Sequence, residues 1–132
     1  MASYQLLLRG TFSAAHRLKM YDGRLEPLHG HNWRVEVTLG GRELDAIGVV
    51  CDFTLLQRHL SQTLAELHDS CLNDLPAFAR QNPSTELVAK HVHDQLAPSL
   101  PSAVRIAKVQ VWETENCAAA FIPVEDPPQR AD

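Results

Sequence analysis

His29 and His31 lie one residue apart at the start of a segment that alternates like a β-strand. In a strand, residues i and i+2 leave the same face, so both imidazoles can reach one ion. His16, at the end of the preceding apolar segment, is the third candidate, because pairing of the two segments brings it near His29. Three neutral imidazoles without a fourth protein ligand are typical of a catalytic zinc with one open position. An HxH pair is also common in a strand pair or a solvated turn, so spacing alone leaves both interpretations open.

The composition limits what else the chain can be. It has 132 residues, 45% of them hydrophobic, which suits one compact domain with its own core. We expect that domain to span residues 1–125, with 126–132 as a flexible C-terminal tail. The formal charge of -4 offers no basic surface for nucleic acid, and no apolar run reaches membrane-spanning length. Because a secretory signal is also missing, we expect a cytoplasmic protein without nucleic-acid or membrane partners.

Two strands must position the histidines. Residues 4–15 are rich in strand formers and lead directly to His16. Residues 31–40 alternate, and one face is wholly apolar: Trp33, Val35, Val37 and Leu39. We therefore expect a second, half-buried strand that ends at Gly40 and Gly41.

Two helices are predicted after these strands. Asp52 suits the N-cap of the first helix, whose buried stripe is expected at Phe53, Leu56, Leu60, Leu64 and Leu67. The second helix begins where Asn82 or Ser84 caps and Pro83 fits the first turn, and Pro98 stops it. Its inward residues are expected to be Leu87, Val88, His91, Val92 and Leu96.

The last two predicted elements are strands at residues 103–114 and 118–125, joined by a tight connection around 115–117. The element order is then ββααββ. This order predicts an α+β fold, with an antiparallel sheet and both helices on one face of it.

Six segments, in order along nearly the whole chain, resemble the 6-pyruvoyltetrahydropterin synthase / 6-carboxytetrahydropterin synthase family. They are FSAAHRL (12–18), LHGHNWRVEV (28–37), GVVCDFTLL (48–56), LND (72–74), PSTE (83–86) and VQVWET (109–114). The resemblance implies a tunnelling fold, in which ββααββ subunits form trimers around a β-barrel and two trimers stack into a homo-hexamer. It also implies Zn²⁺ bound by His16, His29 and His31, and 7,8-dihydroneopterin triphosphate as the substrate class.

The WET segment contains Glu113 and Thr114 and matches the family's sequence motif that binds the pterin ring. A carboxylate can accept two hydrogen bonds from the amino and amide N–H groups of the ring. Glu113 therefore corresponds to the pterin-binding glutamate, with Thr114 beside it. Without the motif, Glu113 would be interpreted as a strand-end carboxylate facing water.

The chain departs from the family at the base that transfers a proton. In the bacterial spacing, the family's catalytic cysteine lies four residues before His29, where this chain has Leu25. The three cysteines of the chain match neither that position nor a thiolate zinc cage: Cys51, Cys71 and Cys117. Glu26 is next to the gap, and a subset of the family is understood to use a glutamate there to form 6-hydroxymethyl-dihydropterin. Glu26 is therefore the candidate base, with an ordinary loop carboxylate as the alternative.

A second departure concerns an aspartate–histidine couple. The family has Asp then His shortly before a Leu-Asn pair, whereas this chain has His68 then Asp69. The exchange either destroys the couple or is compensated by a one-residue shift of the loop. Both residues are kept as candidate catalytic groups.

The sequence thus predicts a zinc-dependent lyase that acts on 7,8-dihydroneopterin triphosphate or a related pterin. Side-chain elimination and carbon–carbon cleavage both remain open as the reaction, as do pyruvoyl, carboxy and hydroxymethyl products. The alternative is a zinc- and pterin-binding homologue without synthase activity. Arg17, Lys19 and Arg24 are candidates for the triphosphate only because they lie near the site in sequence.

Overall fold

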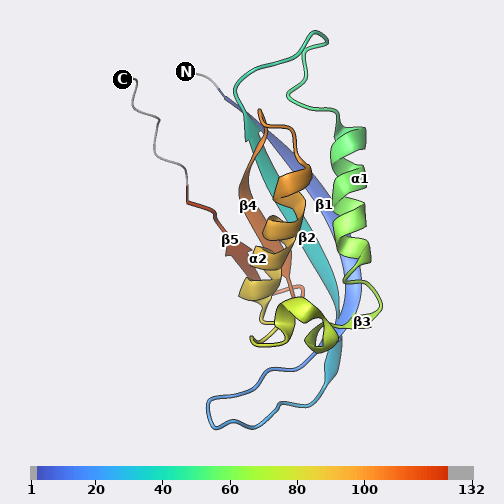
Figure 1. Ribbon diagram of the computed structural model, residues 1–132, viewed down its shortest axis with the longest axis vertical. Coiled ribbons are helices and arrows are strands. Elements are labelled where there is room, and N and C mark those ends of the chain that lie inside the picture. The colour runs from blue at the N-terminus through green and yellow to red at the C-terminus, as the bar shows by residue number, and fades with distance from the viewer. Residues whose placement is uncertain (1–2, 125–132) are drawn as a thin grey trace.

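The computed structural model describes residues 3–124, so the predicted tail at 126–132 lies outside the described residues. Two helices cover one face of a five-stranded sheet, as Figure 1 shows. The strand order is β3-β1-β2-β4-β5, with β1 Tyr4–His16, β2 His29–Gly41, β3 Ser70–Cys71, β4 Arg105–Trp112 and β5 Ala118–Phe121. The helices are α1 Phe53–Ala65 and α2 Thr85–Leu96, with short 3-10 turns at Leu72–Asp74, Pro76–Phe78 and Ala97–Ser99. The predicted α+β class, with both helices on one face, is confirmed.

The long hairpin of β1 and β2 sets the position of the histidines. The strands are antiparallel, and their register pairs His16 with His29 and Ala14 with His31. Pairs opposite each other in a sheet share a face. All three histidines therefore lie on the face that, further along the hairpin, carries the buried Phe12 and Trp33.

Helix α1 begins as predicted and buries a slightly shorter stripe. The Asp52 carboxylate accepts a hydrogen bond of 2.8 Å from the N–H of Thr54, which caps the helix. Leu56, Leu60 and Leu64 are buried against the sheet. Phe53 was expected in this stripe but is 53% exposed. It is the first residue of the helix, so the buried stripe begins one turn later.

Helix α2 is capped by Ser84, which decides between the two predicted caps. The Ser84 hydroxyl accepts a hydrogen bond of 3.2 Å from the N–H of Leu87. Pro83 precedes this cap, so the prediction that it occupies the first helical turn was wrong. The buried residues of α2 include three of the five predicted inward positions, Val88, Val92 and Leu96, while Leu87 and His91 are half-buried.

The sheet contains one strand that the sequence did not predict. Strand β3 has two residues, and it pairs in parallel with Ala14 and Ala15 of β1. The four longer strands are antiparallel as expected, but the sheet as a whole is mixed. A two-residue strand is too short to leave a periodic pattern in the sequence.

Among residues 3–124, no helix has the length and apolar character needed to cross a membrane.

Candidate metal centre

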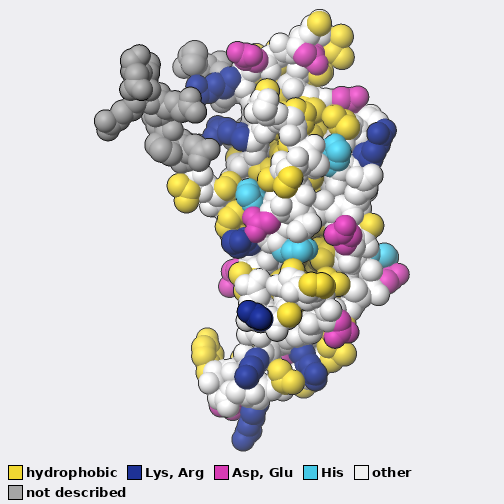
Figure 2. All heavy atoms as spheres, viewed as in Figure 1, with side chains coloured by type: hydrophobic (Ala, Val, Ile, Leu, Met, Phe, Trp, Pro, Cys, Tyr) yellow, Lys and Arg dark blue, Asp and Glu magenta, His cyan; other side chains and the backbone are white. Residues whose placement is uncertain are grey.

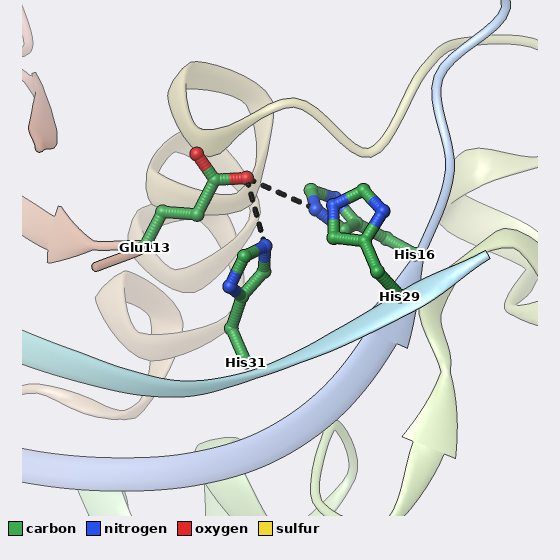
Figure 3. Close-up of side chains that lie close together, drawn as sticks. All are labelled: His16, His29, His31 and Glu113. Atoms are coloured by element: carbon green, nitrogen blue, oxygen red, sulfur yellow. Dashed lines mark ion pairs between the residues drawn. The ribbon is translucent and has the colours of Figure 1, made fainter. Parts of the chain in front are cut away.

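Three imidazoles and one carboxylate converge at the end of the β1–β2 hairpin (Figure 3). They belong to His16, His29, His31 and Glu113, and one potential ligand atom from each lies within 4.8 Å of all the others. The ring centroids are 4.6 Å apart for His16 and His29, 5.1 Å for His16 and His31, and 4.8 Å for His29 and His31. The three predicted histidines are thus brought together within one chain.

Backbone carbonyl groups orient two of the rings. Nδ1 of His16 lies 2.9 Å from the Pro83 carbonyl oxygen, and Nδ1 of His29 lies 2.8 Å from that of Pro27. A carbonyl oxygen only accepts, so each Nδ1 donates its hydrogen. The neutral ring then has its lone pair on Nε2. This arrangement is usual for metal-bound histidines, whose second nitrogen donates to a carbonyl or carboxylate.

Trp33 forms the floor of the cluster. Its ring centroid lies 4.9 Å from that of His16 and 5.3 Å from that of His31, in edge-to-face contacts. The indole Nε1–H donates a hydrogen bond of 3.2 Å to the carbonyl of Ala14, and Phe12 stacks on the indole. Because Trp33 is fully buried and bonded, it limits movement of the two imidazoles above it.

The buried imidazole nitrogens lack partners. Nε2 of His16 and Nε2 of His31 are buried, and neither has a hydrogen-bond partner among the described residues. Burial lowers the pKa of His31 below its usual value of 6.5, and the positive charge that His16 and His29 can carry adds to this, whereas Glu113 opposes it. Neutral imidazoles with inward lone pairs are the protonation state that metal binding requires. The donor set of three imidazole nitrogens and a carboxylate oxygen fits zinc.

Glu113 joins the cluster, which the sequence-based ligand set did not include. Its Oε1 lies 3.0 Å from His16 Nε2 and 3.3 Å from His31 Nε2, and its side chain is 28% exposed. Glu113 therefore lies close enough to be a fourth ligand, whereas the sequence-based set of three histidines left the fourth position open. Strand parity contained the missing signal, because Val109, Val111 and Glu113 alternate onto the same face.

Glu26 lies beside the cluster but outside it. Its Oε1 is 3.9 Å from His29 Nε2 and accepts a hydrogen bond of 2.9 Å from the N–H of Leu18. The N–H of Glu26 donates in turn to the carbonyl of Leu18, at 3.0 Å. Leu25, in the place of the family's cysteine, is 52% exposed. A carboxylate therefore adjoins the histidines where the sequence lacks a thiol.

Two asparagines hold the segment that bonds Glu26. Asn73 accepts from the N–H of Arg17 at 3.0 Å and donates to the carbonyl of the same residue at 2.8 Å. Asn82 forms the equivalent pair with Lys19, at 2.8 and 3.0 Å. The two side-chain amides therefore pair with the backbone N–H and C=O groups of this segment as a neighbouring strand would. The sequence gave no reason to expect this role.

His68 and Asp69 form a couple of their own. Nε2 of His68 lies 3.3 Å from an oxygen of Asp69, and Nδ1 of His68 accepts from the N–H of Ser13 at 3.1 Å. Asp69 has a φ of 56°, which turns the backbone so that neighbouring side chains meet. Among the described residues, no hydrogen bond or ion pair joins the couple to Glu113 or to the three histidines, although Asp69 and His31 line one surface pocket. The side chains of the couple are 51% and 80% exposed.

Thr114 is exposed and takes part in the turn between β4 and β5. Its hydroxyl accepts a hydrogen bond of 3.3 Å from the N–H of Asn116, and its own N–H points to the carbonyl of Cys117 at 3.5 Å. These bonds hold the turn that follows Glu113. Within the described residues, no hydrogen bond joins Thr114 to the histidines.

Comparison with known proteins decides the family. Residues 5–123 match the sequence profile of 6-pyruvoyl tetrahydropterin synthase. The chain belongs to this family. The human 6-pyruvoyl tetrahydrobiopterin synthase is 33% identical over 85% of this chain and 86% of its own length. The dihydroneopterin monophosphate aldolase of Pyrococcus furiosus is 31% identical, over 83% of this chain and 89% of its own.

Solved structures of the family agree with the fold. The Caenorhabditis elegans 6-pyruvoyl tetrahydropterin synthase superimposes with a TM-score of 0.80 at 27% identity, covering 94% of this chain and 98% of that chain. The tunnelling-fold subunit and a pterin-processing enzyme family are therefore established for this chain. Its relatives include both synthases and an aldolase, so family membership alone does not choose the reaction.

Proposed function

We propose that this protein is a zinc-dependent lyase that cleaves the side chain of a phosphorylated dihydroneopterin to give 6-hydroxymethyl-dihydropterin. One observation carries the choice of reaction. The Glu26 carboxylate lies 3.9 Å from His29, beside the position where the family's cysteine is replaced by Leu25. A carboxylate at this place can serve as a general base, and a leucine cannot.

His16, His29 and His31 would hold the zinc, which supplies Lewis acidity that favours deprotonation of the side-chain hydroxyls. The two unpartnered Nε2 atoms of His16 and His31 support this assignment. Glu113 would anchor the pterin ring by accepting hydrogen bonds from its amino and amide N–H groups, with Thr114 shaping the turn beside it.

The proposed cleavage uses one proton, which Glu26 takes and returns. Glu26 removes the proton from the 2′-hydroxyl, and the C1′–C2′ bond breaks as C2′ becomes an aldehyde. The electron pair of that bond passes to C1′, where conjugation with the dihydropterin ring stabilises it. The proton from Glu26 then adds to C1′ and completes the hydroxymethyl group. The phosphorylated two-carbon aldehyde is the second product.

The loop that carries Glu26 suits a phosphorylated substrate. Residues 17–28 link β1 to β2, and Arg17, Lys19 and Arg24 are exposed on this loop. Figure 2 shows Lys and Arg side chains gathered at this end of the molecule. Arg24 pairs with Asp22 at 3.5 Å, which leaves Arg17 and Lys19 as the cations of this loop best placed to attract phosphate.

Two relatives bear on the choice of cleavage. The Pyrococcus furiosus relative is an aldolase of a dihydroneopterin phosphate, which is carbon–carbon cleavage of the kind proposed. A Plasmodium vivax synthase has a catalytic glutamate but shares only 20% identity with this chain, so that likeness supports the fold and leaves the role of Glu26 to experiment. We also retain His68 and Asp69 as a proposed proton-transfer couple, which their ion pair supports.

Product analysis tests the function. We would incubate the zinc-loaded protein with 7,8-dihydroneopterin monophosphate and triphosphate and identify products by mass. Glu26→Gln should abolish the 6-hydroxymethyl product while zinc content stays unchanged. Glu43→Gln is the matched control. It removes an exposed carboxylate just after β2, at the opposite end of that strand from His29, and should keep full turnover.

The other outcomes discriminate the alternatives. A pyruvoyl or carboxy product, or full activity in Glu26→Gln, would contradict the assignment of Glu26. Pterin binding without turnover, lost in Glu113→Ala, would identify a binding homologue instead. Absence of any pterin binding would refute the proposed substrate class.

A further inference from the structure

The carboxylate of Glu113 faces two imidazole nitrogens without a hydrogen bond to either. The distances from its Oε1, 3.0 Å to His16 Nε2 and 3.3 Å to His31 Nε2, are short enough for one. Both nitrogens nevertheless lack a hydrogen-bond partner within residues 3–124. The carboxylate oxygen therefore does not lie on the axis along which either nitrogen would direct a hydrogen.

The tautomer of His16 makes this contact unfavourable on its own. Nδ1 of His16 donates to Pro83, so in the neutral ring Nε2 presents a lone pair. The side chain of His16 is 1% exposed, so the lone pair of the neutral ring has no access to water and its repulsion from the nearby carboxylate oxygen is not relieved by a hydrogen bond. A cation shared by the two atoms removes the repulsion.

The distances also fit a shared metal ion. Zinc bonds to nitrogen and oxygen of about 2.0–2.1 Å place neighbouring ligand atoms of a tetrahedron about 3.3–3.4 Å apart. The separations of 3.3 and 3.0 Å from Glu113 Oε1 to His31 and His16 lie near this value. Oε1 of Glu113 is thus close enough to Nε2 of His16 and of His31 to share an ion with them, and the ligand atom of His29 lies within 4.8 Å.

The sheet delivers Glu113 to this place. Glu113 directly follows β4, whose last residue, Trp112, pairs with Arg34 of β2. The N–H of Glu113 donates to the carbonyl of Cys117 at 3.0 Å, which fixes its backbone in the β4–β5 turn. In Figure 3 its side chain points from the end of β4 toward the histidines. His31, in β2, and Glu113, directly after the adjacent strand β4, are therefore held by the same sheet.

Glu26 is engaged differently. Its Oε1 accepts a hydrogen bond from Leu18 and lies outside the group of mutually close ligand atoms. The two carboxylates near the histidines thus have different partners, and only that of Glu113 is close enough to all three imidazoles to bind the same metal ion.

We infer that Glu113 is the fourth ligand of the metal in the substrate-free protein, and that it leaves the metal when a pterin ring binds. Four protein ligands close the coordination sphere, whereas catalysis needs an open position. The N–H groups of the ring compete for the same carboxylate, so recognition of the ring would open the metal to the side-chain hydroxyls. This second step rests on the proposed function, whereas the first does not.

Cobalt substitution tests the ligand assignment without substrate. Co²⁺ replaces Zn²⁺ in such sites, and its visible absorption depends on the number and type of its ligands. We expect Glu113→Gln to change the Co²⁺ spectrum and to weaken metal binding about tenfold or more. Glu26→Gln and Glu115→Gln, which remove nearby carboxylates that are not ligands, should leave the spectrum of the wild-type protein unchanged. Circular dichroism would establish that each variant is folded.

The outcomes separate this inference from the proposed function. An identical spectrum and affinity in folded Glu113→Gln would overturn the ligand assignment, whether or not the enzyme turns over. Should that variant fail to fold, Glu113→Asp, which keeps the charge but shortens the side chain, must show the altered spectrum. Addition of 7,8-dihydroneopterin should shift the wild-type spectrum, and an unshifted spectrum with bound pterin would overturn the exchange.

Discussion

The chemistry of each histidine and glutamate at the site depends on the hydrogen-bond partners of its side chain. His16 and His29 each donate Nδ1–H to a proline carbonyl, which directs Nε2 to the cluster. The Glu26 carboxylate accepts from the N–H of Leu18, whereas the Glu113 carboxylate has no hydrogen bond of this kind within residues 3–124 and faces the imidazoles. The histidine pattern was visible in the sequence, but these partners were not. Pro83 lies 67 residues from His16, and the pairing of Leu18 with Glu26 depends on the course of the loop between β1 and β2.

His91 allows a prediction about pH at the same scale. Burial lowers its pKa below the usual 6.5, with Glu66 and Asp94 opposing the shift, and its ring packs on Phe78. In the unfolded chain the pKa returns to its usual value, so below about pH 6.5 the unfolded state binds more protons. The free energy of unfolding should therefore fall as the pH decreases through 6.5 toward the folded-state pKa.

Urea titrations at about pH 7.5 and 5.5 would measure this loss, with a chelator present so that metal release does not contribute. His91→Gln should lose less stability than the wild-type protein over this interval. His31, whose pKa is also lowered, is common to both proteins and cancels in the comparison. Equal losses in the two proteins would show that His91 is not a source of the pH dependence.

At the scale of elements, periodic patterns predicted most of the fold. Alternation placed Trp33, Val35 and Val37 correctly on the buried face of β2, and the helical stripe placed α1. Elements without a period were missed, namely strand β3 and the segment at residues 17–19 that two asparagines hold. The membership of Glu113 in the cluster was predictable from strand parity, but the family resemblance directed attention to its pterin role instead.

The asparagine-held segment gives a prediction for the loop between β1 and β2. Asn82 makes two hydrogen bonds to the backbone of Lys19, so Asn82→Ala should lower the free energy of unfolding by about 1–3 kcal/mol. The loop should also become more open to trypsin at Lys19 and Arg24. Asn116→Ala, at an exposed asparagine, is the control and should change neither measurement. Unchanged stability and cleavage in Asn82→Ala would mean that Asn82 does not hold the loop.

The sheet has two edges at which strands of another chain could pair. On its outer side, β1 is paired only at Ala14 and Ala15, and β5 has β4 as its single neighbour among the described strands. Unpaired N–H and C=O groups along an edge are a template for pairing with another chain. The homo-hexamer with a shared β-barrel, inferred from family resemblance, remains a prediction that these edges support.

Mass measurement decides between a monomer and this assembly. Light scattering on the protein as it elutes from a size-exclusion column should give the mass of six 14.7 kDa chains. If two trimers stack, dilution should yield trimers before monomers. The reason is that edge pairing within a trimer closes the sheet, while the contact between trimers leaves no strand edge to satisfy. The couple of His68 and Asp69 is exposed in the single chain, and we expect this assembly to remove it from solvent. A mass of 14.7 kDa at every concentration would refute the assembly and leave the couple in solvent.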